Sequence, residues 1–67
     1  MSIAKHIEIT SDSSTSFEDA VQEGIQRAGK TVKGIRSAWV KDQQVLVEDN
    51  KVVTYRVNMK VTFVVGD

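Results

Sequence analysis

The only tryptophan of the chain, Trp39, lies in the segment IRSAWVKDQQ, residues 35–44, among small, charged and amide residues. An indole in such a setting either fills a core that it reaches from an unusual direction or offers a flat face on which something stacks. The difference decides whether the segment belongs to the fold or to a binding site. The side of the strand on which Trp39 lies therefore decides between these two roles.

His6 and Glu8 are the one pair of neighbouring residues in this sequence that could act as a general acid and a general base. General acid–base or nucleophilic catalysis would also need a nucleophile in a recognisable arrangement with them. The sequence offers none, so we interpret the pair as a polar contact across a sheet. We expect a protein that is not an enzyme.

Two polar runs are candidates for ion binding. SDSSTS, residues 11–16, precedes a predicted helix, where backbone N–H groups attract anions, but it lacks the glycines of a phosphate loop and is explained by helix capping. Glu48, Asp49 and Asn50 offer oxygens that suit a hard cation such as calcium. Three residues in one turn are too few for a calcium loop, so we expect a solvated turn and no metal site within one chain. In a symmetric oligomer, carboxylates from several subunits can converge, and this alternative stays open.

The nine basic and nine acidic residues of the chain cancel, which leaves no electrostatic footprint for nucleic acid or an anionic membrane. No segment has the apolar length of a transmembrane helix or the pattern of a signal peptide. We therefore expect a cytoplasmic protein that binds neither nucleic acid nor membrane.

The 67 residues form a single domain, residues 1–67, whose own core must be small. Small domains are usually stabilised further by disulfides, a structural metal or partner subunits. The chain has no cysteine and one histidine, so it cannot close a disulfide or complete a zinc site alone. Oligomerisation is the remaining route to stability.

The order of apolar residues predicts a strand and then a helix. In residues 3–10 isoleucines alternate with other residues, as in a half-buried strand. Ser16 and Asp19 have the spacing of a capping box, and apolar residues then recur at three- and four-residue steps as far as Gly34. This pattern predicts an amphipathic helix of about 17 residues. Gly24 on its apolar face indicates a close approach of the helix backbone to a sheet.

Two long strands are predicted on either side of EDNK, residues 48–51, which has favourable turn chemistry. Residues 53–65 alternate between an apolar and a polar face. In the preceding strand the parity of the apolar residues changes across residues 42–44, which predicts a β-bulge or a sharp bend. A strand of about 14 residues spans roughly 46 Å, against roughly 25 Å for the helix, so the hairpin curls around the helix or extends beyond it.

These elements predict an α+β fold of order β-α-β-β, with a three-stranded antiparallel sheet wrapped around one helix. An arm of the hairpin that extends beyond the helix leaves unpaired strand edges, which proteins commonly pair with another subunit. We therefore expect the chain to assemble into a closed homo-oligomer.

The segment IEITSDSSTSFEDAVQEGIQRAGKTVKGIR and the alternating VVTYRVNMKVTFVV together resemble the dodecins. The resemblance covers nearly the whole chain. It implies a small β-α-β-β protein that forms a hollow shell of twelve subunits and binds a flavin, FMN or riboflavin, often as stacked pairs. It also implies a role in sequestering or storing the flavin without catalysis.

The resemblance further implies a ligand site in which this chain departs from the flavin-binding pattern. Ser37 occupies the position at which those proteins carry the tryptophan that stacks on the isoalloxazine ring, and Trp39 stands two residues later. Arg56 replaces the glutamine that hydrogen-bonds the pyrimidine edge of the flavin. Asp42 matches an aspartate near the ribityl chain, and Gln43 follows it as in that pattern. The candidate flavin-binding residues are thus Ser37, Trp39, Asp42, Gln43 and Arg56.

Strand parity places Trp39 on the polar face together with Ser37 and away from the core. Two residues along a strand move a side chain by about 6.6 Å, so the indole can stack on a flavin only if the ligand moves with it. Arg56 can donate to a flavin carbonyl but cannot accept from the ring N–H. Packing in a subunit interface, or a cross-strand contact with Arg56 or Lys60, would equally satisfy the indole.

Two hypotheses about function remain. In the first, the chain forms a flavin-binding shell, with Trp39 as the stacking group. In the second, the shell has lost flavin binding and holds an ion such as calcium or another small ligand. Neighbouring arginines at position 56 would favour an anion there. A monomeric interaction module is disfavoured by the long strands and the small core.

Overall fold

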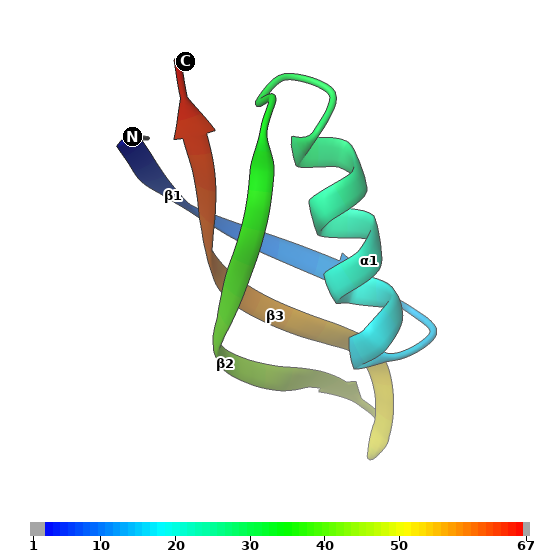
Figure 1. Ribbon diagram of the computed structural model, residues 1–67. Helices are drawn as coiled ribbons and strands as arrows, with labels where there is room; N and C mark the ends of the chain where they lie inside the picture. Colours follow the sequence, from blue (N-terminus) through cyan, green and yellow to red (C-terminus); the bar gives the residue numbers. More distant parts are fainter. Residues whose placement is uncertain (1–2, 67) are drawn as a thin grey trace.

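The computed structural model describes residues 3–66 and contains one helix packed on one face of a three-stranded sheet (Figure 1). Within the described residues no helix is long and apolar enough to span a bilayer. Both neighbours of β3 run antiparallel to it, and the order across the sheet is β1-β3-β2. This confirms the predicted α+β fold and its β-α-β-β order. In chain order the elements are β1 (Ile3–Ser13), α1 (Phe17–Ala28), β2 (Ile35–Glu48) and β3 (Lys51–Val65).

Strand β1 is three residues longer than predicted. The polar run that follows Thr10 was expected to end the strand, yet Ser11, Asp12 and Ser13 continue the pairing with β3. Two of these three side chains have hydrogen-bond partners: Asp12 contacts a β3 residue, and Ser13 is buried under the turn into the helix. Small polar residues are tolerated here because their hydrogen bonds are made within the fold.

The start of α1 is fixed by two serines. Ser16 Oγ accepts a hydrogen bond of 3.0 Å from the backbone N–H of Asp19, as the predicted cap requires. Asp19 does not complete the capping box by reaching back to Ser16. Its carboxylate instead accepts a 2.7 Å hydrogen bond from Ser13 Oγ, which itself accepts from the backbone N–H of Thr15 at 2.9 Å. The helix is therefore tied directly to the end of β1.

Helix α1 ends at Ala28, earlier than the predicted end near Gly34. Gly29 has helical dihedral angles and caps the last turn, but glycine contributes little to helix propagation. The chain must then return to the sheet. It does so at Gly34, whose positive φ of 78° suits glycine and whose carbonyl accepts a hydrogen bond from the N–H of Val64.

The core between helix and sheet is small, as the chain length predicts. Its fully buried side chains are Ala20, Val57, Met59 and Val61. Gly24 faces this core, and a Cβ atom placed on it would lie 2.8 Å from Met59 Cε and 2.9 Å from Ser11 Cβ. The expected close approach of helix and sheet is therefore confirmed.

The hairpin between β2 and β3 has the predicted turn and a bulge close to the predicted position. Asp49 and Asn50 have φ values of 52° and 64°, which match the two left-handed positions of a type I′ turn. The register shifts between Val40 and Asp42, so the bulge lies at Lys41, one residue before the predicted range. Val40 pairs with Met59 before the bulge, and Val45 pairs with Tyr55 after it.

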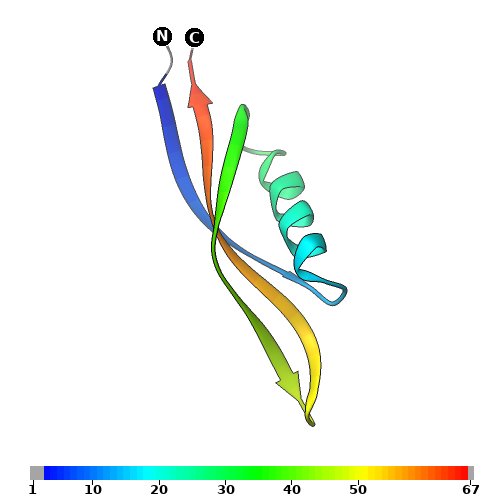
Figure 2. The same ribbon diagram turned by 60° about the horizontal axis from the view of Figure 1, so that its bottom comes forward.

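The end of this hairpin extends beyond the rest of the molecule (Figure 2). The pairing of β1 with β3 ends at Tyr55, so residues 46–54 form a two-stranded arm without a third strand. The chain accordingly measures 51 Å along its longest axis and 19 Å across. Val47 and Val52 face each other on the arm and are 55% and 47% exposed. The arm thus has the unpaired edges and exposed apolar side chains expected of a subunit.

Candidate functional site

The side of the sheet that faces away from α1, here called the polar face, carries its side chains in rows across the three strands. Adjacent strands in register place paired residues on the same face, so each row takes one residue from β1, one from β3 and one from β2. In the order β1, β3, β2 the four rows are His6–Thr62–Ser37, Glu8–Lys60–Trp39, Thr10–Asn58–Asp42 and Asp12–Arg56–Gln44.

Trp39 lies on the polar face and is 64% exposed, as its strand parity predicted. The Nζ atom of Lys60 lies 5.9 Å from the ring centroid, within the range of a cation–π contact. The His6 ring lies 6.4 Å from the indole and is tilted by 34°. Of the two cross-strand contacts considered from the sequence, the structure contains the one with Lys60. Most of the surface of Trp39 is exposed to solvent in the single chain.

Next to the tryptophan row, oxygen-bearing side chains surround a shallow cavity of roughly 170 Å³. Asn58 links two neighbours here: its Oδ1 accepts from Thr10 Oγ1 at 2.8 Å, and its Nδ2 donates to Asp42 Oδ1 at 2.6 Å. Lys41 reaches across β3, and its Nζ donates to Glu8 Oε2 at 3.1 Å. The lining residues are Glu8, Ile9, Thr10, Lys41, Asp42 and Asn58.

The last complete row, Asp12–Arg56–Gln44, contains an ion pair. Arg56 Nε and Nη2 donate to Asp12 Oδ1 and Oδ2 at 2.7 and 2.9 Å, the two-pronged geometry that makes arginine–carboxylate pairs strong. The hydrogen bond from Arg56 holds the pKa of the Asp12 carboxyl below its ordinary value of 3.8. The charge of Arg56 is thus already neutralised within the chain, which removes the reason to expect an anion at this position.

The structure brings four of the five candidate ligand residues to the polar face: Ser37, Trp39, Asp42 and Arg56. Gln43 lies in register with the core residue Val57 and therefore faces the side of the sheet on which α1 packs. Gln44 takes the place beside Arg56, because the bulge at Lys41 shifts the parity by one residue.

Sequence reasoning missed the other polar residues around the cavity: Thr10, Lys41 and Asn58. The signal that identifies them is parity combined with register, since Thr10 and Asn58 share the polar parity of their strands and pair with each other. Lys41 joins them only because it occupies the bulge.

The remaining candidates from the sequence are not gathered into a site. His6 Nδ1 pairs with Thr62 Oγ1 at 3.0 Å, and Glu8 pairs with Lys41, so each makes the expected contact across the sheet. Asp49 and Asn50 form the turn at the tip of the arm. Among residues 3–66 no three histidine, cysteine, aspartate or glutamate side chains gather closely enough to hold a metal. A cation site within one chain would therefore need neutral oxygen ligands as well.

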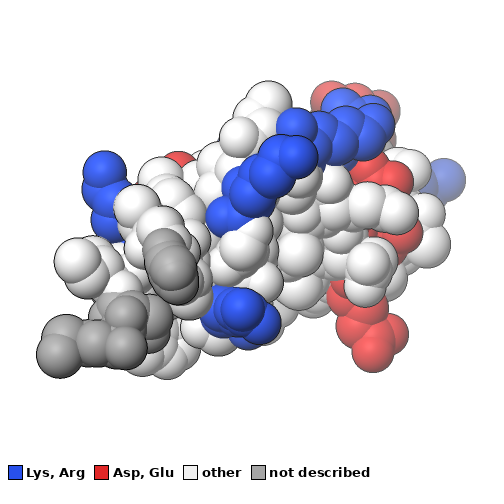
Figure 3. Space-filling model, turned by 45° about the horizontal axis from the view of Figure 1, so that its top comes forward, with Lys and Arg blue, Asp and Glu red and all other residues white. Residues whose placement is uncertain are grey.

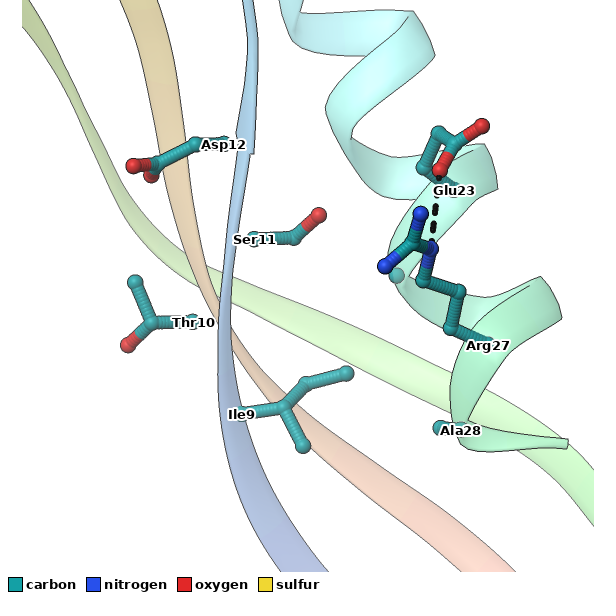
Figure 4. Close-up of a pocket in the computed structure, with 8 residues that line it drawn as sticks. Ile9, Thr10, Ser11, Asp12, Glu23, Arg27 and Ala28 are labelled. Carbon is teal, nitrogen blue, oxygen red and sulfur yellow. Dashed lines mark ion pairs between the residues drawn. The ribbon is translucent and has the colours of Figure 1, made fainter. Parts of the chain in front are cut away.

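A larger hollow of roughly 480 Å³ lies between the free edge of β1 and α1 (Figure 4). Ser11 and Ile9 point toward the helix, whereas Thr10 and Asp12 point away from it, onto the polar face. Arg27 is paired at 3.3 Å with Glu23 one helical turn earlier. Ile9 and Thr10 line both this hollow and the smaller cavity, so the two adjoin at β1.

Both signs of charge occur on the face of the molecule shown in Figure 3, and the basic side chains there are interrupted by white, uncharged surface. No uniform basic field covers this face. The view agrees with the cancelling charges of the sequence.

Comparison with known proteins gives consistent results. A model of the Dodecin family matches residues 3–66. The chain is 41% identical over 63 residues to the protein named calcium dodecin of Mycobacterium tuberculosis, covering 94% of this chain and 89% of that protein.

Solved structures give the same picture. The crystal structure of calcium dodecin from the same organism matches with a TM-score of 0.81 and 39% identity, over 91% of this chain and 87% of that one. A variant of the Thermus thermophilus dodecin matches over the whole of both chains with a TM-score of 0.93 and 25% identity. Dodecin from Streptomyces davaonensis has the same fold, with a TM-score of 0.94 at 23% identity over 98% of this chain and 97% of that one.

The resemblance drawn from the sequence is therefore confirmed over the described chain, and the family consists of non-catalytic proteins that bind small ligands, flavins in some and calcium in others. The chain belongs to the dodecin family.

Proposed function

We propose that this chain is a calcium-binding dodecin whose ion site is the cavity between Glu8, Thr10, Asp42 and Asn58 on the polar face. The observation that carries the proposal is the 41% identity over 94% of the chain to a protein named calcium dodecin. It favours the second of the two functions expected from the sequence, an ion-holding shell, over the flavin-binding one.

The donor set around the cavity fits calcium. Calcium takes about six to eight oxygen ligands and tolerates carboxylates, amide carbonyls and water together. Glu8 and Asp42 supply two oxygens each, Asn58 one and Thr10 one, which makes six side-chain oxygens around one cavity. The lining contains no sulfur and no imidazole, so it does not suit the softer transition metals.

The same face fits a flavin less well than the flavin-binding pattern implies. Ser37 offers no ring at the stacking position, and the guanidinium of Arg56 is engaged by both carboxylate oxygens of Asp12. A flavin edge would have to compete with Asp12 for these donors. It would also find no acceptor on Arg56 for its ring N–H.

Assembly is part of the proposal. A closed shell, of twelve chains as the family resemblance implies, would cover the exposed valines of the arm and add to a core of only four fully buried side chains. It would also bring polar faces of several chains close together, which increases the number of oxygens available to one ion. Cytoplasmic location remains a prediction from the sequence.

A flavin-binding shell is the second candidate, and one observation favours it: Trp39 is 64% exposed. Stacking would require a flavin displaced along β2 from Ser37 to Trp39. The test is titration of FMN or riboflavin with the protein, because contact with an indole quenches flavin fluorescence. Quenching at micromolar protein would support this candidate, and unchanged emission would eliminate it.

Isothermal titration calorimetry tests the main proposal. The protein is first dialysed against a chelator and then titrated with calcium chloride and, separately, with FMN. We expect saturable heat with calcium and none with FMN. Absence of calcium binding at millimolar ion concentration would contradict the proposed function.

A further inference from the structure

Lys41 occupies an unusual place in the sheet. Val40 pairs with Met59 and Asp42 pairs with Asn58, so Lys41 is the extra residue of the bulge and has no partner on β3. Bulges often re-aim a side chain. Here Lys41 crosses the central strand, and its ammonium group donates to Glu8 Oε2 on the far strand at 3.1 Å.

The ammonium group therefore sits beside the oxygens to which we assign the calcium ion. Lys41 and Asp42 line the same cavity, together with Glu8. Glu8 and Asp42 bring two negative charges, and Lys41 neutralises one of them. Of the basic side chains in the described chain, only Lys41 lines this cavity.

The contact between Lys41 and Glu8 is easily broken. The two side chains are 48% and 64% exposed, and an exposed pair of this kind changes an equilibrium constant by less than a factor of about five. A divalent ion offers twice the charge of an ammonium group and several coordination positions. A divalent ion can therefore displace the Lys41 ammonium group from Glu8. A monovalent ion cannot do so as easily, because it carries the same charge as the lysine, and the lysine is held close to Glu8 at a high local concentration.

We infer that Lys41 is a tethered cation that competes with calcium for Glu8, so that calcium binding releases Lys41 into solvent and the lysine sets both the affinity of the site and its preference for divalent ions. The inference rests on the proposed function. It adds a residue that lowers the affinity of the site, and it makes the bulge at position 41 part of the binding mechanism.

A double-mutant cycle tests the inference. Calcium affinity is measured by calorimetry for the wild type, Lys41→Met, Glu8→Gln and the double variant, all checked for unchanged secondary structure and mass. Lys41→Met keeps the length of the side chain and removes its charge, so we expect calcium to bind about two- to fivefold more tightly. In the Glu8→Gln background the same substitution should have much less effect, because the carboxylate that Lys41 contacts is gone.

Lys30→Met is the matched control. It removes one positive charge at an exposed position just after α1, away from the polar face, and should leave calcium affinity unchanged. An equal gain for Lys30→Met and Lys41→Met would show a general charge effect and overturn the inference. A Lys41→Met variant that binds calcium no more tightly than the wild type would overturn it as well. If the wild type itself does not bind calcium, the proposed function fails first.

Lysine labelling gives a second test that needs no variant. Wild-type protein is treated briefly with acetic anhydride with and without calcium, and modification of each lysine is measured by peptide mass spectrometry. Calcium should raise the modification of Lys41 at least twofold relative to Lys30, because the released amine no longer contacts Glu8 and is more accessible to the reagent. Unchanged or reduced modification of Lys41 in calcium-saturated protein would contradict the inference.

Discussion

Arg56 and Asp12 form a two-pronged ion pair across β3 and β1, with N–O distances of 2.7 and 2.9 Å. The pair joins the two strands at the end of the polar face that adjoins the arm. It occupies the position that the flavin-binding pattern assigns to a glutamine, and it leaves the guanidinium with its best donors engaged. The polar face of this chain is therefore arranged differently from a flavin-binding face.

The pair predicts a specific dependence of stability on pH. Arg56 lowers the pKa of Asp12 in the folded chain below 3.8, so the unfolded chain binds more protons between the two values. The stabilising contribution is present above pH 3.8 and is lost as the pH falls through the lowered pKa. We expect Arg56→Met to unfold at higher pH than the wild type in an acid titration followed by circular dichroism. The two proteins should become equally stable below the folded pKa of Asp12.

Asp12→Asn provides the control for that experiment. This variant removes the titrating group and keeps the shape of the side chain. Its free energy of unfolding should therefore not show the loss at low pH that we attribute to protonation of Asp12. A difference between wild type and Arg56→Met that persists unchanged to the lowest pH would show that Arg56 stabilises the fold by packing instead of by its charge.

Gly24→Ala should weaken the contact between helix and sheet. The new Cβ would lie 2.9 Å from Ser11 Cβ, which is fixed to the β1 backbone, and 2.8 Å from the more adaptable Met59 Cε. Overpacking of this kind costs about 1–3 kcal/mol in the free energy of unfolding. Urea unfolding at one fixed protein concentration measures it.

Gly29→Ala is the matched variant. Gly29 has a φ of −65°, and the nearest atom to an added Cβ is the Ile25 carbonyl oxygen at 3.3 Å. Its free energy of unfolding should stay within about 1 kcal/mol of the wild type. Equal losses for the two variants would mean that the close approach at Gly24 is not what limits side-chain size there.

Asp42→Asn should reduce calcium affinity at least about tenfold, because carboxylate charge sets the affinity of oxygen-ligand sites. The variant retains an oxygen and the shape of the side chain, so the hydrogen-bonded row with Asn58 can still form. Asp49→Asn, in the turn of the arm, removes the same charge at a position that asparagine tolerates with positive φ. Calorimetry that finds the larger loss for Asp49→Asn would move the ion site to the tip of the arm.

Placing lysines on the arm should disrupt assembly. Val47 and Val52 pair across the hairpin and are both about half exposed, and charged side chains there would resist burial against a neighbouring chain. Sedimentation velocity should show a smaller species for Val47→Lys/Val52→Lys than for the wild type. Gln22→Lys/Gln26→Lys, on the exposed side of α1, adds the same charge and should retain the wild-type mass. An arm variant of unchanged mass would exclude the arm from the subunit contact.

The elements that depend on local pattern were predictable from the sequence. The alternation in β3, the turn at Asp49 and the cap at Ser16 each have a signal within a few residues, and the structure contains all three. The end of α1 was predicted too late because the apolar spacing continues past Ala28. The return of the chain to the sheet at Gly34 is a tertiary requirement that no local pattern records.

The site was less predictable because it depends on register. Parity correctly placed Trp39 on the polar face, but the neighbours of Asp42 follow from the bulge at Lys41, and a shift of one residue exchanges the faces of all later side chains. Gln43 was a candidate because it follows Asp42 in the flavin-binding pattern, whereas the structure places it on the side of the sheet that faces α1. Asp12, the partner of Arg56, was not predicted because it lies in a serine-rich segment that was expected to end β1.

Terbium luminescence tests the central claim most directly. Terbium replaces calcium in oxygen-ligand sites and emits when a nearby indole transfers energy to it, and the chain has one tryptophan, in the row next to Asp42. With excitation that selects tryptophan, we expect terbium emission that saturates, that calcium reverses, and that is lost in Trp39→Phe and strongly reduced in Asp42→Asn. Terbium that binds without emission sensitised by Trp39, or with equal emission in Asp42→Asn, would contradict a calcium site on the polar face.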